Sequence, residues 1–417
     1  MGATRSTIDA VLKDIYLARM LTTINSSTIL LSHIEQDTGM TTVSGKQAQA
    51  PVNIRGSQAI GARADGGVLP TAQSQTYVET VISYAFNYAT IEVTHPAIAS
   101  SKNKTGAWAK VLSSEMEGIT RDVAVDQNRV SFGWGFGILG TCYATQGGGG
   151  SLSLVLDPGH QVKVGMLIDV WDGLTTATLR LEGLTVSAVV GDTCTIDTLS
   201  TWTNGWYVTR HGSCLFSGAS SVCYEQMGLM GIIDDQTKSS GIGTFVTTLQ
   251  GIARATYPEW NGNVMEGSTP GTARELTSQL LDEAILKPQE TSGKKVDLGI
   301  CTPTQFRRIG DLMVPDRRYT DSTELQGGFT ALKWAGIPIA WDKDCPKDSN
   351  GYDMLFLLNT DELHRYELQD WDWDDEDGNI LHRVETYAKY GATAFYYGNL
   401  GCTDPAAQLV IRDLANS

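Results

Sequence analysis

The sequence lacks most of the patterns that identify catalytic and metal-binding proteins. Its seven cysteines are scattered without a CxxC pair, and its six histidines form no HExxH motif and no Cys/His cluster. An odd number of dispersed cysteines argues against a disulfide framework and against a structural zinc site. We therefore expect free thiols in a reducing cytoplasm.

Long apolar runs and prolines are also scarce. No apolar stretch approaches the ~20 residues that a membrane-spanning helix needs, and the N-terminal segment lacks the apolar core of a signal peptide. The 417 residues allow two or three domains, and 44 glycines against 12 prolines are typical of a β-rich chain with many turns. We expect no membrane partner.

Basic residues are outnumbered, with a formal net charge of −16. The segment Asp342–Asp413 alone holds sixteen acids and six bases, whereas the first 68 residues are almost balanced. Such a chain does not hold polyanions by neutralising phosphates, so sequence-specific DNA binding is not expected. The densest basic feature, Arg307 and Arg308 with Arg317 and Arg318, is interpreted as an inter-subunit salt-bridge patch or a solvated helix face.

The acidic stretch DWDWDDEDG (370–378) resembles a calcium loop but does not fit one. An EF-hand loop needs glycine at its sixth position and glutamate at its twelfth, and neither is present when the loop starts at Asp370 or at Asp372. We predict an exposed turn after a strand that carries Trp371 and Trp373 on one side. Weak, opportunistic cation binding is the alternative.

Three further motifs also lack the context that their chemistry requires. GWGFGILG (133–140) contains GxGxxG but follows a helix, so we predict a tight turn rather than a dinucleotide site. QGGGG (146–150) lacks the Lys-Ser/Thr of a phosphate loop and is predicted to be a flexible hinge at a domain insertion. No histidine lies near Cys301 in sequence, which favours a core thiol over a nucleophile. We predict no catalytic, cofactor-binding or metal-binding residue and no cofactor.

The N-terminal hundred residues predict two extended features. Residues 7–24 have the apolar spacing of a short amphipathic helix. After a polar, glycine-rich stretch, residues 76–94 alternate as one long strand. One face of this strand carries Val78, Thr80, Ile82, Tyr84, Phe86 and Tyr88. Val52 and Ile54 allow a partner strand, which gives an elongated hairpin with a tip near Gly56–Gly67.

The remaining chain predicts a long helix, a small β unit and a mixed region. Apolar residues of 106–132 form one helical stripe at Trp108, Leu112, Met116, Ile119, Val123 and Val130. Short strands between turns in 151–217 suggest a small barrel or sandwich. A capped helix is predicted over 272–286, ending before Pro288, and a second begins at Pro303.

Strands are predicted around 294–302, 336–345 and 353–368, and two long aromatic-rich strands in the tail. An isolated hairpin is marginal in water. A helical arm, a long hairpin and aromatic tail strands are difficult to bury within one compact monomer, and exposed surfaces of this kind mark interaction sites. The pattern favours obligate assembly.

This order of parts resembles the major capsid proteins of tailed bacteriophages, which have the Hong Kong 97-type fold. GARADGGVLPTAQSQ leading into TYVETVISYAF resembles the extended E-loop, and the segment from VTHPAIASSK to SFGWG resembles the entry to the spine helix. GGFTALKWAGIPIAWDKDCP followed by DMLFLLNTDELHRYEL resembles the axial-domain segment. The resemblance implies an α+β capsid fold over nearly the whole chain.

The resemblance also implies a division of the chain. The parts are the N-arm (1–45), the E-loop (46–95), the peripheral domain with the spine helix (96–150), an all-β insertion domain (151–217), the axial domain with return segments of the peripheral domain (218–368) and the C-terminal strands of the peripheral domain (369–417). Some family members are cross-linked between a lysine and an asparagine. Lys46 lies at the base of the loop and residues 56–72 contain no lysine, so we do not transfer that chemistry.

The function implied is structural, not enzymatic: a virion protein that self-assembles as hexamers and pentamers into an icosahedral head around double-stranded DNA. The implied partners are further copies of the chain, a portal, a decoration protein and the packaged DNA. Arm and loop occupy the residues before the spine helix, so we expect a separate scaffolding protein. Assembly would take place in the host cytoplasm.

Three other classes stay open. An encapsulin-like compartment shell would share the fold but enclose protein. A phage or bacterial surface-binding β protein, such as a fibre or adhesin, would use 151–217 as its ligand module. An enzyme is the third.

Overall fold

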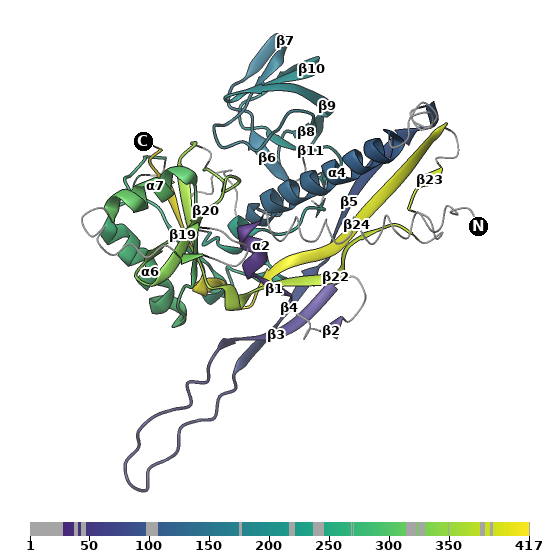
Figure 1. Ribbon diagram of the computed structural model, residues 1–417. Helices are drawn as coiled ribbons and strands as arrows, with labels where there is room; N and C mark the ends of the chain where they lie inside the picture. Colours follow the sequence, from purple (N-terminus) through teal and green to yellow (C-terminus); the bar gives the residue numbers. More distant parts are fainter. Residues whose placement is uncertain are drawn as a thin grey trace.

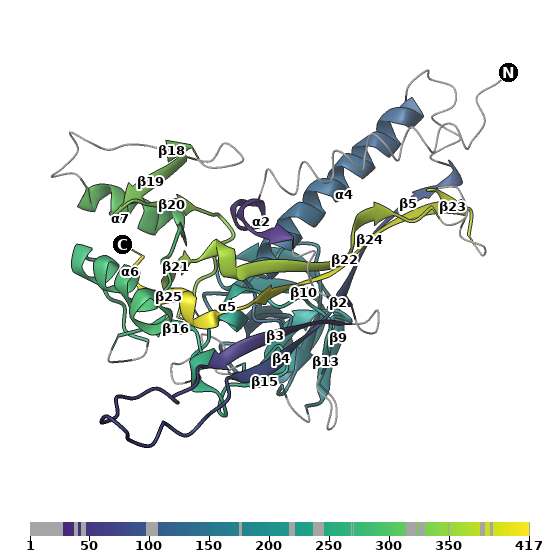
Figure 2. The same ribbon diagram turned by 90° about the horizontal axis from the view of Figure 1, so that it is seen from below.

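The computed structural model describes most of the chain from residue 28 onward (Figure 1). The described residues are 28–36, 41–42, 47–96, 107–174, 177–216, 222–236, 246–267, 269, 271–313, 323–324, 330–348, 350–375, 380–383 and 387–416. The predicted helix at 7–24 and Lys46 lie outside them. Three main bodies are seen: a long sheet beside a long helix, a β-barrel, and a second sheet flanked by helices (Figures 1 and 2).

The long sheet is centred on a strand that is paired along both edges. Its strands are β1 (Glu35–Gln36), β22 (Leu363–Trp373), β24 (Lys389–Cys402), β23 (His382–Arg383) and β5 (Ala85–Thr94). The helix α4 (Ala107–Phe132) packs against β5, and the short helix α2 (Ile29–His33) contacts α4. Met116 and Val123 of α4 share a core with Ile91, Trp371 and Trp373. The predicted stripe is thus confirmed for the described part of α4.

The predicted strand 76–94 is two strands, β4 (Thr76–Ser83) and β5, which belong to different sheets. The buried positions are Thr80, Ile82 and Tyr84 before the break, but Ala85, Ala89, Ile91 and Val93 after it. The alternation therefore shifts by one residue at Tyr84, because a one-residue change of register exchanges the two faces of a strand. Phe86 and Tyr88, predicted to share one face with Ile82 and Tyr84, are exposed, whereas Ile82 and Tyr84 are buried.

The predicted hairpin is confirmed. β3 (Gln47–Arg55) pairs with β4 in antiparallel register from Gln47–Ser83 to Arg55–Thr76, and β2 (Thr41–Thr42) adds a short third strand. The connection, 56–75, projects away from all three bodies (Figure 1).

The β unit is a closed six-stranded barrel. Its strands, in spatial order, are β6 (Ile138–Thr141), β11 (Tyr207–Arg210), β8 (Leu167–Trp171), β9 (Leu179–Val190), β10 (Thr193–Trp202) and β7 (Gln146–Val155). A bridge between Cys142 and Leu156 joins the first strand to the last. The hinge predicted at 146–150 is wrong, because these residues are the first half of β7. The barrel begins at Ile138 rather than at 151, since β6 is paired with β11.

The second sheet has seven strands with helices beside it. In order they are β16 (Asn263–Met265), β25 (Leu409–Leu414), β21 (Asp353–Leu358), β17 (Leu298–Cys301), β20 (Ile337–Trp341), β19 (Thr330–Trp334) and β18 (Thr323–Glu324). The predicted buried strands are confirmed at β17 and β21, where every residue is buried. The last tail strand, β25, belongs to this sheet rather than to the long sheet, because it pairs with β16 and β21.

The helices of this body are α6 (Ser278–Ser292) and α7 (Pro303–Leu312). Helix α6 starts later and ends later than predicted. Thr277 caps its start by accepting a bond from the Leu280 amide, and Gly293, at φ 77°, ends it. Pro288 does not end the helix but lies buried inside it, where it removes one backbone bond near the last turn.

The remaining described elements are short. They are β12 (Cys214–Leu215), β13 (Val222–Cys223), α5 (Leu229–Ile232), β14 (Thr248–Leu249), β15 (Ile252–Ala253), η1 (Pro258–Trp260), η3 (Thr360–Glu362) and η4 (Pro405–Ala407). Within the described residues, no helix combines the length and the apolar character that crossing a membrane requires.

The barrel is held tightly against the seven-stranded body at Gly159. A Cβ atom on Gly159 would lie 2.2 Å from the Asp348 carbonyl oxygen, and the nearby Lys163 ammonium lies 3.6 Å from the Asp344 carboxylate. Only a residue without a side chain permits this approach.

We expect Gly159→Ala to loosen the barrel and to lower the free energy of unfolding by about 1–3 kcal/mol, because the backbone must move to admit the methyl group. Faster amide exchange in 157–163 and 343–348 would report the loosening. The control is Gly118→Ala in α4, where an added Cβ meets nothing within 4 Å; it should be neutral or gain up to ~1 kcal/mol. Unchanged exchange in Gly159→Ala would contradict this account of the contact.

Candidate inter-subunit interface

The hairpin loop exposes apolar side chains that no other residue in the described part of the chain covers. Ile60, Val68 and Leu69 are 90%, 87% and 80% exposed, and they lie together in the connection between β3 and β4. Single exposed apolar residues are ordinary, but three in one projecting loop are characteristic of a surface that a partner covers.

The loop nevertheless has a defined shape. The Asn53 side-chain amide donates to Gln75 Oε1 at 2.7 Å, and the Ser57 hydroxyl donates to the Gln73 carbonyl at 2.9 Å. Farther out, Arg63 Nε donates to the Val68 carbonyl at 3.0 Å. These bonds join the outgoing and returning halves of the loop, so the loop projects as a two-stranded extension.

The base of the hairpin is fixed to the body. Arg55 donates two hydrogen bonds to the Glu259 carboxylate, at 2.7 and 3.0 Å, and its guanidinium lies 5.5 Å from the centre of the Tyr257 ring. The hydrogen bond from Arg55 lowers the pKa of Glu259. Val52 and Val78 pack on the main core. The Arg55–Glu259 ion pair and the packing of Val52 and Val78 therefore fix the hairpin strands to the body at the point where the loop begins.

A second uncovered surface lies on the long sheet. We call it the aromatic patch: Phe86 and Tyr88 on β5 with Phe395 and Tyr397 on β24. The ring of Tyr397 lies 5.1 Å from Phe86, 6.0 Å from Tyr88 and 5.4 Å from Phe395. Phe86 and Tyr88 remain 45% and 62% exposed. Four aromatic rings in contact at the surface are the kind of group that protein interfaces bury.

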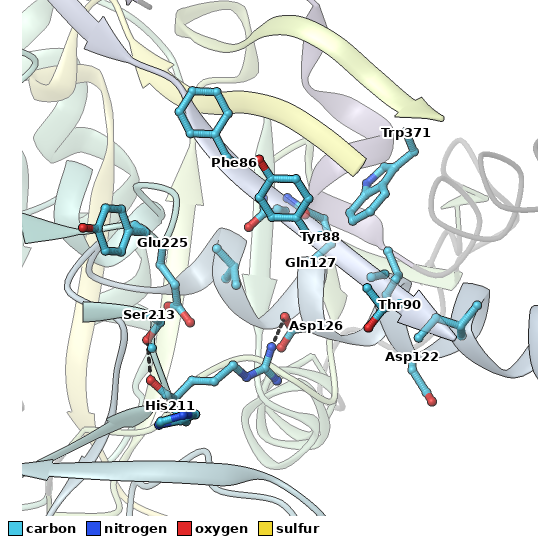
Figure 3. Close-up of a pocket in the computed structure, with 18 residues that line it drawn as sticks. Phe86, Tyr88, Thr90, Asp122, Asp126, Gln127, His211, Ser213, Glu225 and Trp371 are labelled. Atoms are coloured by element: carbon cyan, nitrogen blue, oxygen red, sulfur yellow. Dashed lines mark hydrogen bonds and ion pairs between the residues drawn. The ribbon is translucent and has the colours of Figure 1, made fainter. Parts of the chain in front are cut away.

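Between β5, α4 and the barrel lies a cleft of about 680 Å³ (Figure 3). Its floor holds an ion-pair network. Buried Arg129 donates to Asp126 at 3.1 Å and to Glu225 at 2.7 Å, and Arg210 of the barrel donates to Asp126 at 2.7 Å. Burial alone would raise the pKa of Asp126, but the charges of Arg129 and Arg210 outweigh it and lower that pKa.

The two arginines and two carboxylates of this network balance each other. None of the four is therefore left as an uncompensated base or cation for chemistry, and the network instead connects the barrel to α4.

Next to the network, Asp169, His211 and Ser213 occur together but do not form a nucleophilic triad. His211 Nδ1 lies 2.8 Å from Asp169, and the hydrogen bond with that carboxylate raises the pKa of His211. The Ser213 hydroxyl donates to the Arg210 carbonyl at 2.8 Å instead of to the imidazole. Asp169 also accepts bonds from the amides of Gly183 and Gly212. The group thus fixes a turn of the barrel.

The acidic stretch is in part a buried strand. Trp371 and Trp373, at the end of β22, are 5% and 0% exposed and share one core, as predicted. Asp370 and Asp372 each accept a bond from the amide that follows them. Residues 376–379, the predicted turn, lie outside the described residues. Among the residues that the structure describes, no group of three or more His, Cys, Asp or Glu side chains is arranged to hold a metal ion.

The other predicted positions are structural. Cys301 is fully buried, where burial raises its pKa well above the ordinary value. Gly135 and Gly137 have φ of 74° and 62° and form the tight turn that leads into β6. Arg307 is exposed, and Arg308 lies 3.9 Å from Glu275. Arg317 and Arg318 lie outside the described residues.

Sequence reasoning missed the aromatic patch and the ion-pair network. The signal for the patch was present, because small residues recur at Ala85, Ala89, Ala392 and Ala394. These alanines alternate with the large rings along β5 and β24. The alanines leave room for α4 on one face of the sheet, and the large rings lie on the opposite face. The network carried little signal: Asp126 and Arg129 have i,i+3 spacing, but their partners Arg210 and Glu225 lie 84 and 96 residues farther along the chain.

Comparison with known proteins supports the fold through structure alone. No family model matches the chain, and no curated protein matches it. Among solved structures, a chain of the cyanophage A-1(L) capsid asymmetric unit is similar with a TM-score of 0.53 at 14% identity, over 92% of this chain and 91% of that one. The chain has a phage capsid fold. The α+β, Hong Kong 97-type architecture predicted from the sequence is thereby confirmed.

Two further structures are similar with lower scores. The capsid of cyanophage P-SCSP1u has a TM-score of 0.46 at 11% identity, over 94% of this chain and 89% of that one. The SrpI encapsulin complex from Synechococcus elongatus PCC 7942 has a TM-score of 0.46 at 9% identity, over 93% and 88%. The fold assignment rests on the A-1(L) capsid.

The contact between barrel and body predicts a pH effect at Asp157. Burial raises its pKa to about 6 from an ordinary 3.8, while the Thr141 amide donates to it at 2.7 Å. The folded protein therefore binds this proton more tightly than the unfolded chain. Its stabilising contribution is complete below pH ~4 and is lost as the pH rises through about 6.

We expect Asp157→Asn to be more stable than the parent at pH 7 by about 1–3 kcal/mol, because the amide oxygen keeps the bond from Thr141 without a buried charge. The gain should vanish near pH 4. Thermal unfolding at the two pH values measures it, with exposed Asp311→Asn as the control. A variant no more stable than the parent at pH 7 would contradict the assignment.

Proposed function

We propose that this chain is the major capsid protein of a tailed bacteriophage, which assembles as hexamers and pentamers into an icosahedral head around double-stranded DNA. The observation that carries the proposal is the hairpin. A capsid fold presents a rooted, two-stranded extension whose apolar side chains its own chain leaves bare.

The energetic argument is the burial of this loop. Fully burying Ile60, Val68 and Leu69 against a neighbour would contribute roughly 5–8 kcal/mol per subunit, at about 1.5–3 kcal/mol for each large aliphatic side chain. Arg55 and Glu259 fix the direction of the loop, so little orientational freedom is lost on contact. If each subunit contacts the next one through its loop, the interface is heterologous, and repeating it around an axis produces a closed ring of subunits.

We propose that the parts of the capsid fold correspond to the elements described. The E-loop is the β3–β4 hairpin, the spine helix is α4, and the peripheral domain is built on β5, β22 and β24. The axial domain is built on the seven-stranded sheet, including β25, and the insertion domain is the barrel from β6 to β11. The N-arm comprises the residues that precede the hairpin.

The proposed partners are other copies of the chain, a separate scaffolding protein, a portal and a decoration protein. The location is the virion, and the host cytoplasm during assembly. The role is structural rather than enzymatic, which is supported by the balanced charges of the cleft and by the committed Ser213 hydroxyl. The excess of acids would limit adhesion of packaged DNA to the wall.

The loop is tested by Ile60→Asp/Val68→Asp/Leu69→Asp. Because these side chains make no core contact in the subunit, the variant should remain folded and soluble. It should fail to form closed particles, since three charges would have to be buried. Size-exclusion chromatography with negative-stain microscopy measures both properties.

The matched control is Val190→Asp, an apolar residue that is 77% exposed at the end of β9 in the barrel. Normal shells are expected from it. If the triple variant also forms normal shells, the loop is not the contact between subunits.

The function itself is tested on particles. The expressed chain should form shells visible by negative stain, and particles from the native source should contain double-stranded DNA. Isolated capsomers should bind DNA weakly, whereas shell integrity should be insensitive to salt. Native particles filled with protein would indicate an encapsulin-like compartment, trimers a fibre or adhesin, and a compact monomer would end the proposal.

A further inference from the structure

Two of the seven cysteines lie opposite each other where the barrel joins the body. Cys214 on β12 and Cys223 on β13 are direct partners in the antiparallel register. The chain enters the barrel through 133–137, and the described residues 211–216 and 222–226 follow its last strand, so the pair lies at the neck between the two bodies.

The register places this pair in the type of position that a disulfide can occupy. The Tyr224 amide donates to the Ser213 carbonyl at 2.9 Å, so Ser213 and Tyr224 form a hydrogen-bonded pair. In an antiparallel ladder such pairs alternate with non-hydrogen-bonded ones, in which the Cα atoms are ~4.5 Å apart and the side chains are closer. Cys214 and Cys223 are the next pair along. Disulfides span Cα separations of about 4.4–6.8 Å.

The sulfur atoms also meet. A Cβ atom on Gly137 would lie 2.6 Å from Cys214 Sγ and 3.0 Å from Cys223 Sγ, so both sulfurs converge on the bare face of that glycine. A hydrogen bond between the two thiols raises the pKa of Cys214. The single proton of the Cys214 thiol is shared between this contact and the Phe136 carbonyl, which accepts from Cys214 Sγ at 2.9 Å and so links the exit segment to the entry segment.

No other cysteine has this arrangement. Cys194 is opposite Leu154, and Cys142 is opposite Leu156. Cys301 is opposite Leu355 and Trp341, Cys402 is opposite Leu363, and Cys345 lies outside the strands. Cys223 is only half-buried and is the thiol that a small molecule can reach, whereas Cys214 is 5% exposed.

We propose that Cys214 and Cys223 are a redox-active pair that closes to a disulfide when the protein meets a small-molecule disulfide such as oxidised glutathione. The Cys223 thiolate attacks one glutathione sulfur, forms a mixed disulfide and releases one glutathione thiolate. The Cys214 thiolate then attacks Cys223 Sγ and releases the second. The glutathione disulfide gains two electrons, both protein thiol protons leave, and two glutathiones are produced.

The bond would join the strand that leaves the barrel to the strand that returns to the body. It would therefore fix the neck once a particle passes from a reducing cell to an oxidising medium. In the reduced protein the two segments of the neck have no covalent link between them.

The experiment uses the full chain, first reduced and then treated with oxidised glutathione. Alkylation under denaturing conditions, followed by mass spectrometry, counts the free thiols. We expect the number of alkylated cysteines to fall from seven to five, with a peptide in which Cys214 is linked to Cys223. Seven alkylated cysteines, glutathione retained on Cys223 of the parent chain, or bridges between chains would each overturn the proposal.

Variants separate the two roles. Cys214→Ser should retain glutathione on Cys223, because no second thiol displaces it. Cys223→Ser should take up none, because Cys214 is buried. Cys194→Ala, which removes a buried barrel thiol outside the pair, should still form the bridge and fall from six alkylated cysteines to four. Since peptide mapping of the parent chain needs no variant, a substitution that does not fold leaves the test intact.

Discussion

The double pairing of β24 is the constraint on which the rest of the molecule depends. One edge is bonded to β22 from Cys402 to Ala394, and the other to β5 from Gly398 to Lys389. Because β5 continues directly from β4, this pairing fixes where the hairpin leaves the body. The Asn399 side chain donates to the Ser83 carbonyl at 2.8 Å at that exit.

The crossing at this exit leaves no room for a side chain. A Cβ atom on Gly401 would lie 2.4 Å from Tyr366 and 2.7 Å from Ile82, a buried residue of the hairpin strand β4. The hairpin is thus held by close packing at its start and by Arg55 and Glu259 farther along. A rigid root and a bare loop belong together, since only a loop held in one direction can meet the same place on every neighbour.

The sequence revealed those elements whose pattern is local. The helix α4, the barrel strands and the hairpin follow from spacing and turn residues, and alternation correctly placed Trp371 and Trp373 on one side of a strand. Features that depend on which strands pair with each other could not be predicted from the sequence. The break at Tyr84 arises because β4 and β5 belong to two different sheets. The sequence of β25 is typical of a tail strand, and only its pairing with β16 and β21 assigns it to the second sheet. QGGGG looked flexible, but it forms the first half of β7, which pairs with β10. Ion pairs such as Arg210 with Asp126 connect residues that no spacing rule relates.

The charge distribution illustrates the same distinction between sequence and structure. Asp342–Asp413 is the most acidic segment, yet several of its carboxylates serve the fold and do not face solvent. Asp413 is fully buried and accepts bonds from Arg274 Nε at 2.8 Å and the Gly267 amide at 2.6 Å, and Asp342 is bonded to the Asn128 amide at 3.0 Å. Burial raises the pKa of both.

A carboxylate that accepts hydrogen bonds from donors a few ångströms away contributes little to the electrostatic potential far from the protein surface. Repulsion of a polyanion must therefore come from exposed acids such as Asp361 and Asp370, and the formal charge of the segment overstates it. Under the proposed function, the direction of the hairpin, and with it the pairing of β24, would set which of these exposed acids face packaged DNA.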